Sequence, residues 1–425
     1  MVAASGEGRD LAMKNLRVLF YSRRFFPTIS GMSVYALNLL RELCKHGIEV
    51  TLVAQYRGDA QGRAVYGGGP PIAVPGVTVI GAESVGEVVG GDFERDIETL
   101  VRIGVREHAR RPFDLVHAQY GYPPGLAALE TSRKLGIPNV VSIQGGDGHW
   151  VGSCCAHHRS AMRAVLDHAG AVLIGSPSFA AEVSEHNGTA PERFTFIPGA
   201  VDTERFRPEA PFHAGELRNA ARPELLFHGR VDARKGALDL IDAFAKLRGM
   251  TALAPRLTVS GIGPDSEAVA ARVRERGLES HVRLTGYVAY EEVPRVYRSA
   301  DVFVSPTYAE GFSNTILEAM ASGIPVLSTR AVGVVDCIRH EDNGLLVEPR
   351  DVDALASSML RLVEDAALRA RLATTAHDEV TRIYAWHEVG RRIIDVYRSL
   401  PAPDDDWSVV QPDPACRYRS APHLL

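Results

Sequence analysis

The chain has 425 residues, of which 45% are hydrophobic and 23% charged, and its formal net charge is −5. These values are typical of a soluble globular protein of two or three domains. The net charge gives no overall attraction to nucleic acid or to an anionic membrane. No apolar run reaches the roughly 18 residues that a membrane-spanning helix needs.

The five cysteines are unevenly spaced and do not form a disulfide framework, which favours a reducing cytoplasmic location. The first residues include Glu7 and Asp10 and have no apolar core, so we do not expect them to form a secretory signal. We expect residues 1–13 to be a disordered leader.

The first regular elements form a strand–loop–helix–strand unit. Leu16–Tyr21 and Ile48–Ala54 are expected strands, and Val34–His46 has the 3.6-residue apolar period of a helix. Gly47 stands where a helix C′ glycine belongs. Such a parallel crossover is the building block of doubly wound α/β folds. Residues 58–91 have weak periodicity and indicate loops and short strands.

The same alternation continues and then starts again. Strands are expected at residues 114–117, 139–143, 171–174 and 194–198, and again at 224–229, 256–260, 282–285 and 302–305. Pro and Gly cluster at 199–211, which indicates an interdomain connection. Two successive α/β runs predict two stacked Rossmann-like domains, over 14–205 and 206–383. A helix is expected within 384–400, and the Pro and Asp residues of 401–425 indicate a mobile tail.

Two glutamates flank a small segment between two buried-strand patterns. Glu310-Gly311-Phe312-Ser313-Asn314-Thr315-Ile316-Leu317-Glu318 lies between Asp301–Pro306 and Pro325–Ser328. A helix that opens after Ser313 would point free backbone N–H groups at an anion, and the carboxylates could accept bonds from sugar hydroxyls. Glutamates are usually solvated, so the pair gains its meaning from this context.

Two cations follow the expected strand at 224–229. Gly229-Arg230 and Lys235-Gly236 stand at a strand–helix junction, where cations oppose the helix macrodipole and therefore need an anionic partner. Arg and Lys fixed beside a departing nucleoside diphosphate would stabilise its developing charge.

Together with the string Glu318–Val326, these segments resemble the Glu-x7-Glu signature of retaining, nucleotide-sugar-dependent glycosyltransferases of family 4. The resemblance implies the two-domain GT-B fold, with the helix of residues 384–400 crossing back onto the first domain. It implies transfer from a UDP- or GDP-type sugar to a hydroxyl acceptor by front-face substitution, without cofactor or metal. It implies catalytic roles for Arg230, Lys235 and Glu310. It also implies a donor site formed by Gly31, Val288, Gly311, Phe312, Ser313, Asn314, Thr315 and Glu318.

The first domain departs from the family pattern. Gln144 occupies the place of a family histidine in Val141–Asp147, and Gln119 replaces the second histidine of a His-x-His pattern. Glutamine cannot titrate but still donates and accepts hydrogen bonds. We interpret the change as altered acceptor recognition, with lost activity as the open alternative. The expected acceptor site includes Tyr120, Gln144, Asp147 and His149.

The run Cys154-Cys155-Ala156-His157-His158 suggests zinc at first sight. Adjacent cysteines do not easily share a tetrahedral site, and no second cluster in the sequence completes one, so we expect a helix start and no metal. The expected partners are a nucleotide sugar and a small-molecule, glycan or lipid-linked acceptor. Nucleic acid is not expected, and a peripheral membrane contact stays open. The alternative functions are a non-catalytic sugar-nucleotide binder and a GT-B sugar-nucleotide epimerase.

Overall fold

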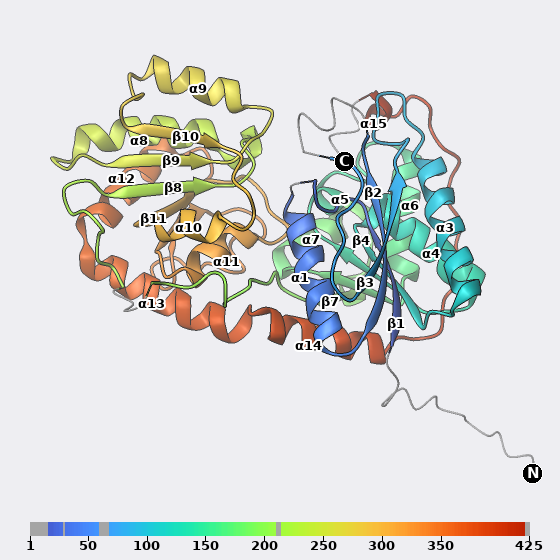
Figure 1. Ribbon diagram of the computed structural model, residues 1–425. Helices are drawn as coiled ribbons and strands as arrows, with labels where there is room; N and C mark the ends of the chain where they lie inside the picture. Colours follow the sequence, from blue (N-terminus) through green and yellow to red (C-terminus); the bar gives the residue numbers. More distant parts are fainter. Residues whose placement is uncertain (1–15, 29, 59–67, 210–213, 421–425) are drawn as a thin grey trace, which may run out of the picture.

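A computed structural model describes residues 16–28, 30–58, 68–209 and 214–420. Within these ranges the chain forms two α/β domains, each built on a parallel sheet with helices packed against it (Figure 1). The two Rossmann-like domains expected from the repeated alternation are therefore confirmed. The expected leader at 1–13 lies outside the described residues.

The first sheet has the strand order β3-β2-β1-β4-β5-β6-β7, and all its neighbouring strands are parallel. The order reverses between β1 and β4, and ligands bind at such a switch point outside the carboxyl ends of the strands. Residues 58–91, which were expected to be loops and short strands, include the edge strand β3. The strands are β1 Arg17–Ser22, β2 Glu49–Tyr56, β3 Val77–Glu83, β4 Leu115–Gln119, β5 Asn139–Ile143, β6 Ala171–Ile174 and β7 Phe194–Phe196.

Helix α1 of this domain begins at Gly31, earlier than its apolar period indicates. Ser30 is the reason, because its Oγ accepts a hydrogen bond from the Ser33 backbone N–H at 3.1 Å and so caps the helix. The helical elements are α1 Gly31–Lys45, α3 Phe93–Arg110, η2 Gly121–Gly125, α4 Leu126–Leu135, α5 Gly146–His149, α6 Ala156–His168, α7 Pro177–Asn187 and η3 Pro191–Arg193.

The second sheet has the order β10-β9-β8-β11-β12-β13 and is also parallel throughout. Its switch point lies between β8 and β11, which are the strands that precede the two cations and the Glu310–Glu318 segment. The strands are β8 Glu224–His228, β9 Arg256–Ser260, β10 Val282–Gly286, β11 Val302–Ser305, β12 Val326–Thr329 and β13 Leu345–Val347. The helices of this domain are η4 Ala233–Lys235, α8 Ala237–Met250, α9 Ser266–Glu275, α10 Val293–Arg298, α11 Asn314–Ala321, α12 Val352–Glu364 and α13 Ala366–Ile383. Two later helices, α14 Trp386–Arg398 and α15 Arg417–Ser420, pack on the first domain.

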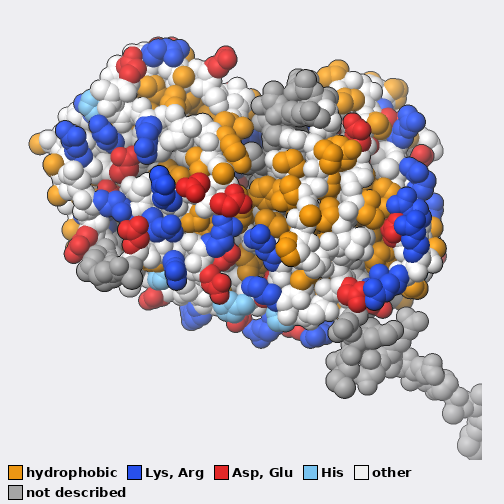
Figure 2. Space-filling view, viewed as in Figure 1, with side chains coloured by type: hydrophobic (Ala, Val, Ile, Leu, Met, Phe, Trp, Pro, Cys, Tyr) orange, Lys and Arg blue, Asp and Glu red, His pale blue; other side chains and the backbone are white. Residues whose placement is uncertain are grey.

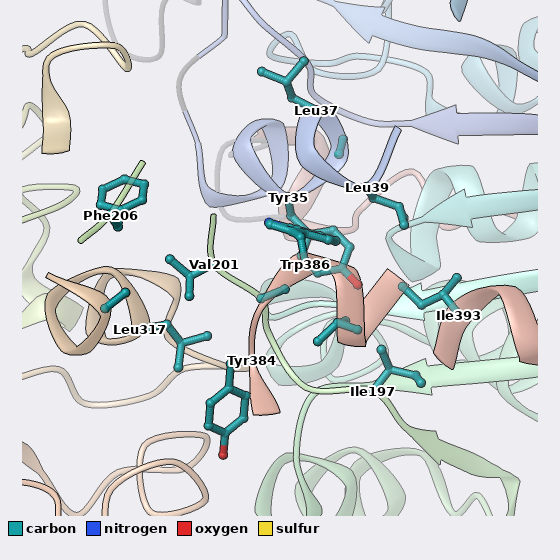
Figure 3. Close-up of a cluster of buried hydrophobic side chains, with 14 of the residues drawn as sticks. Tyr35, Leu37, Leu39, Ile197, Val201, Phe206, Leu317, Tyr384, Trp386 and Ile393 are labelled. Atoms are coloured by element: carbon teal, nitrogen blue, oxygen red, sulfur yellow. The ribbon is translucent and has the colours of Figure 1, made fainter. Parts of the chain in front are cut away.

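Helices α13 and α14 run along the base of both domains and carry the chain back to the first one (Figure 1). Helix α14 packs on α1, where the rings of Tyr35 and Trp386 meet edge to face with centroids 5.0 Å apart (Figure 3). The two segments that connect the domains also touch each other. The Val201 N–H donates to Tyr384 O at 2.9 Å, and the Trp386 N–H donates to Val201 O at 3.2 Å.

The segment after α14 differs from the mobile tail that its composition indicates. Its described part, residues 401–420, lies along the first domain. His168 Nδ1 is 2.8 Å from Asp404 Oδ2, and the Arg133 guanidinium lies 4.2 Å from the centre of the Trp407 ring. Cys416 and Tyr418 are buried in the core of that domain. The burial of these two side chains holds the segment on the first domain, which its Pro and Asp content does not predict.

Cationic and acidic side chains are interspersed over the second domain on the face seen in Figure 2, in keeping with the small net charge. Among the described residues, no helix combines the length and the apolar character needed to cross a bilayer.

Candidate active site in the interdomain cleft

A cleft of about 620 Å³ lies between the domains, at the carboxyl ends of both sheets. Loops after β1, β4 and β5 form one wall, and loops after β8, β10 and β11 form the other. The structure brings nearly all the residues predicted for the site to this cleft. Those that line it are Arg230, Lys235, Glu310, Gly31, Val288, Gly311, Phe312, Ser313, Asn314, Thr315, Glu318, Tyr120, Gln144 and His149.

Asp147 is the predicted site residue that lies elsewhere. Its carboxylate is fully buried and accepts backbone N–H groups of Gly121 at 2.8 Å, Gln144 at 3.1 Å and Gly145 at 2.8 Å. Burial raises the pKa of Asp147 against these hydrogen bonds. The predicted acceptor contact is thus replaced by a structural role, in which Asp147 holds the loop that presents Gln144.

The second-domain wall is rich in cations. Arg230 Nε lies 3.4 Å from Asp232 Oδ2, Arg234 Nη2 lies 2.7 Å from the same oxygen, and Lys235 Nζ lies 2.6 Å from Glu310 Oε1. Burial raises the pKa of Asp232, but the hydrogen bonds and charges of Arg234 and Arg230 outweigh it and hold the pKa at about 2. With Arg350 and Glu318, which also line this wall, four cations face three carboxylates and leave it positive.

The Gly311–Thr315 segment ends at helix α11, whose N-cap residue is Ser313. The first N–H groups of a helix have no partner within it, so they face the cleft as donors for an anion. Gly311 also fits tightly against the other domain, because a Cβ atom there would stand 2.4 Å from Gln144 O. Glycine is therefore required for the two walls to meet at this point.

Glu318 lies one helical turn further on and is buried. Tyr297 Oη donates a hydrogen bond to Glu318 Oε2 at 2.9 Å. Burial raises the pKa of Glu318 to about 7, against the lowering effect of that hydrogen bond. Its carboxyl group is thus half protonated near neutral pH, which allows it either to donate or to accept hydrogen bonds from a ligand hydroxyl.

Gln144 is oriented by Gln119, the second residue that departs from the family pattern. Gln119 Nε2 donates to Met32 O at 2.9 Å and to Gln144 Oε1 at 2.8 Å. Met32 O is a carbonyl oxygen and can only accept a hydrogen bond, so the Gln119 atom beside it must be the amide nitrogen. The same nitrogen donates to Gln144, so the Gln144 atom that it meets must be the amide oxygen. The Gln144 amide nitrogen is then left to donate to a bound molecule.

His149 has a second polar atom to offer. Its Nδ1 lies 2.7 Å from Glu182 Oε1, which fixes the proton there, and its buried Nε2 has no hydrogen-bond partner among the described residues. Tyr120 stands nearby on the same wall with a backbone φ of 97°, which is unusual for a residue other than glycine. Both side chains line the cleft.

The cleft lining that the sequence interpretation missed includes Arg24, Tyr290 and Trp150. Arg24 follows β1 and lies 3.6 Å from Glu87 through Nη2, while Arg23 lies 2.6 Å from the same carboxylate. Two consecutive arginines directly after the first strand could have been used to predict that this loop lines a binding site. Tyr290 accepts a hydrogen bond from Asn38 across the domain boundary at 3.0 Å, and Trp150 closes the acceptor side; neither had a motif to mark it.

A second group of reactive side chains lies outside the cleft lining. Cys155 caps α6, as the expected helix start requires, and both His157 and His158 are buried. Cys416, which the sequence does not connect with this segment, packs beside Cys154, Cys155 and His158. The expectation that nothing completes the cluster is therefore wrong, because the segment after α14 returns to the first domain.

Comparison with known proteins adds to this geometry. Residues 222–365 match the family model described as glycosyl transferases group 1, and residues 30–200 match the glycosyl transferase 4-like domain. The chain is 28% identical over 314 residues to a GDP-mannose-dependent alpha-(1-6)-phosphatidylinositol monomannoside mannosyltransferase of Mycobacterium tuberculosis, covering 71% of this chain and 79% of that protein. It is 28% identical over 398 residues to a D-inositol 3-phosphate glycosyltransferase of Stackebrandtia nassauensis, covering 86% of each.

Solved structures share the fold. Sucrose-phosphate synthase from Thermosynechococcus elongatus superposes with a TM-score of 0.72 at 22% identity, covering 90% of this chain and 98% of that one. HepE of Anabaena, solved with UDP and glucose, superposes with a TM-score of 0.71 at 18% identity, covering 91% of this chain and all of the other.

Proposed function

Because the chain belongs to the group 1, family 4 glycosyltransferases and has their GT-B fold, we propose that it moves a sugar from a nucleoside diphosphate to a hydroxyl acceptor and retains the anomeric configuration. The donor is of the UDP or GDP type. The observation that carries the proposal is the convergence of Arg230, Lys235 and the amino end of α11 on one cleft. Each of them supplies positive charge or N–H donors to an anion.

The reaction fits a front-face substitution. The acceptor oxygen bonds to the anomeric carbon on the side from which the diphosphate leaves, the bond between that carbon and the phosphate oxygen breaks, and the acceptor proton passes to the phosphate. Arg230 and Lys235 would stabilise the charge that grows on the departing diphosphate. Backbone N–H groups at Phe312, Ser313 and Thr315 would bind its distal phosphate.

The carboxylates have binding roles in this scheme. Glu310 would accept bonds from donor-sugar hydroxyls, and the Lys235 contact orients it for that task. Glu318 would hold the ribose, with Tyr297 fixing one of its oxygens. We propose that no catalytic metal takes part, since each cleft carboxylate of the second domain is already engaged by a cation or a hydroxyl group.

The first-domain wall would bind the acceptor. The Gln144 amide nitrogen and His149 Nε2 are unused hydrogen-bonding groups there, and Arg24 adds a cation. A cation at this wall favours an acceptor with negative charge. Two relatives are named for acceptors that carry a phosphate. One is a phosphatidylinositol monomannoside mannosyltransferase, and the other is a D-inositol 3-phosphate glycosyltransferase. We therefore favour a hydroxyl acceptor that carries a phosphate.

Two other functions are less well supported. An epimerase needs carboxylates for C–H acid–base chemistry in the first-domain wall, and none is found among the described residues that line it. A non-catalytic binder would hold the donor without turning it over. Thermal shift with UDP, GDP and their sugars tests donor choice, because a ligand at about 100 times its dissociation constant stabilises by about 2.7 kcal/mol. Transfer assays with acceptors that differ only in the phosphate then test the reaction. Binding with no transfer or hydrolysis across the panel would support the binder instead.

A further inference from the structure

Three thiols and one imidazole converge at the start of α6. Cys154 Sγ and Cys155 Sγ each lie 3.2 Å from His158 Nδ1, and Cys416 Sγ lies 3.4 Å from the same nitrogen. All four of these atoms lie within 4.8 Å of one another. Cys416 is 258 residues away from His158 in sequence, so only the return of residues 401–420 to the first domain brings it here.

Hydrogen bonding does not account for this arrangement. A neutral imidazole nitrogen has one in-plane lone pair, and a thiol is a weak donor, so three sulfurs around one nitrogen exceed what it can satisfy. Four ligands around a common centre do account for it. With Zn–S of about 2.3 Å and Zn–N of about 2.0 Å, the ligand atoms of a tetrahedral site lie about 3.5–3.8 Å apart. The three distances from sulfur to His158 Nδ1, 3.2, 3.2 and 3.4 Å, are close to the expected nitrogen–sulfur separation, and no pair of ligand atoms is more than 4.8 Å apart.

The local chain geometry answers the objection that adjacent cysteines do not share a site. Cys155 is the N-cap of α6, with extended backbone at φ −161°. The first turn of the helix then returns His158 to the same side as Cys155. The His158 backbone N–H also approaches Cys155 Sγ at 3.5 Å, so the cap holds this sulfur close to the His158 ring.

We propose that Cys154, Cys155, His158 and Cys416 bind one zinc ion in a tetrahedral structural site. All four ligands come from protein, so no coordination position is left for a reactant, as in other structural zinc sites. The inference is independent of the proposed transferase reaction, because none of the four residues lines the cleft.

The surroundings suit such an ion. The four ligands are shielded from solvent, since His158 and Cys416 are buried and Cys154 and Cys155 are partly buried. A bound zinc ion deprotonates its cysteine ligands outright. Three thiolates and one zinc ion leave one negative charge on the site.

The ion would fasten two segments at once. The exposed contacts that hold residues 401–420, such as His168–Asp404, stabilise little on their own, whereas a structural zinc site supplies folding free energy directly. The second segment runs from Trp150 to Cys154. Ser153 Oγ donates to Trp150 O at 2.6 Å, and Arg417 Nη2 donates to Ser153 Oγ at 3.3 Å. Zinc would thus also restrain the cleft residue Trp150, because it would fix the adjacent Cys154 and the Ser153 contacts to Trp150 and Arg417.

Metal analysis of the full-length protein, prepared with reducing agent and zinc and without chelators, is the direct test. We expect about one zinc per chain in the wild type and a loss of most of it in Cys416→Ser and His158→Asn. Cys44→Ser is the matched control, since Cys44 lies on α1 and outside the cluster; it should keep its zinc. If Cys416→Ser does not accumulate, Cys154→Ser at a partly exposed position provides the same comparison.

Cobalt provides a second measurement. Replacing zinc with Co²⁺ should give the strong visible absorption of tetrahedral cobalt and near-ultraviolet thiolate-to-cobalt charge transfer, and both should vanish in Cys416→Ser. A wild type with no more zinc than Cys416→Ser would overturn the proposal. So would a disulfide between Cys416 and either neighbouring cysteine in protein kept reduced, or stoichiometric iron in place of zinc.

Discussion

Lys235 Nζ lies 2.6 Å from Glu310 Oε1, so the loop after β8 and the loop after β11 are joined by an ion pair at the floor of the cleft. The loops are also held by backbone, because the Tyr308 N–H donates to Arg234 O at 2.8 Å. In the proposed reaction the donor diphosphate would share Lys235 with Glu310. The ion pair would then fix the position of the sugar relative to the phosphate.

Removing either cation should slow turnover and leave the fold intact. We expect Arg230→Ala and Lys235→Ala each to lower kcat by about 10²–10³, because each removes charge stabilisation from the transition state. Lys246→Ala is the control, since Lys246 pairs with Asp353 on the exposed side of α8. Steady-state rates and circular dichroism provide the comparison. Near-wild-type turnover in both cleft variants would contradict the assignment of the diphosphate to this wall.

Brief chelation should leave transfer unchanged. The expected source of charge stabilisation is Arg230 and Lys235 rather than a divalent ion, so EDTA should not alter the initial rate. Zinc content is measured in the same sample, which separates any effect of the Cys154 cluster from the chemistry. A rate that falls with EDTA at constant zinc and returns with Mn²⁺ or Mg²⁺ would mean that the metal-free mechanism is wrong.

Gln144→Ala should weaken acceptor use and leave donor affinity nearly unchanged, because the donor phosphates are assigned to the other wall. The loss of one neutral hydrogen bond corresponds to about 0.5–1.5 kcal/mol in kcat/KM for the acceptor. Gln144→His should not raise activity, since Gln119 is placed to donate to an amide oxygen. Calorimetry of donor binding and acceptor kinetics check both variants. A large gain of transferase activity in Gln144→His would indicate that the site has lost catalytic function and that the change to Gln144 is part of that loss.

Nucleotide affinity should depend on pH through Glu318. Burial raises the pKa of this carboxyl group to about 7, so it accepts ribose hydroxyls as a carboxylate only above that pH. We expect tighter binding of the free nucleotide as pH rises from 6 to 8, and a smaller change in Glu318→Gln. Calorimetric titrations of both proteins across this range test the expectation; equal slopes would contradict it.

The same group predicts an opposite trend for stability. Its folded pKa lies above the roughly 4.3 of an unfolded glutamate. The extra stability is therefore fully present below pH 4.3 and is lost as pH rises through 7. Glu318→Gln should remove this part of the pH dependence, as measured by chemical denaturation of the ligand-free protein at several pH values.

Gly311→Ala should impair the closed cleft. A Cβ atom at this position would stand 2.4 Å from Gln144 O, and a backbone oxygen cannot move aside without shifting the domain. Overpacking of this kind costs about 1–3 kcal/mol, and we expect both donor affinity and kcat to fall. Gly249→Ala in α8 is the control, because its Cβ would meet nothing within 4 Å. Equal activity in the two variants would show that Gly311 is not a contact between the walls.

Local patterns were enough to predict most strands of the two sheets, but not β13 or the bounds of β3, and they predicted most of the cleft. Strands such as Val302–Ser305 are short apolar runs, and the Arg230, Lys235 and Glu310–Glu318 segments lie directly after them in sequence. Properties that depend on distant parts of the chain were not visible. Asp147 reads as a cleft carboxylate until its three backbone donors are seen. Cys416 gains its meaning only from residues more than two hundred positions away, and Tyr290 from Asn38 on the other domain.

The bridge between Val201 and Ala385 constrains how the cleft can open. The chain passes between the domains twice, near Val201 and near Ala385. If these two connections were far apart, they would resist rotation of one domain relative to the other about most axes. Here both crossings are hydrogen-bonded at one place, so they act as a single hinge at the base of the molecule. Substrate entry then requires the contacts across the cleft to separate, among them Asn38–Tyr290 and Gly311–Gln144, while the hinge itself stays intact. We therefore expect the cleft to open by rotation of one domain about this hinge, with the contacts across the cleft broken and the Val201–Ala385 bridge kept.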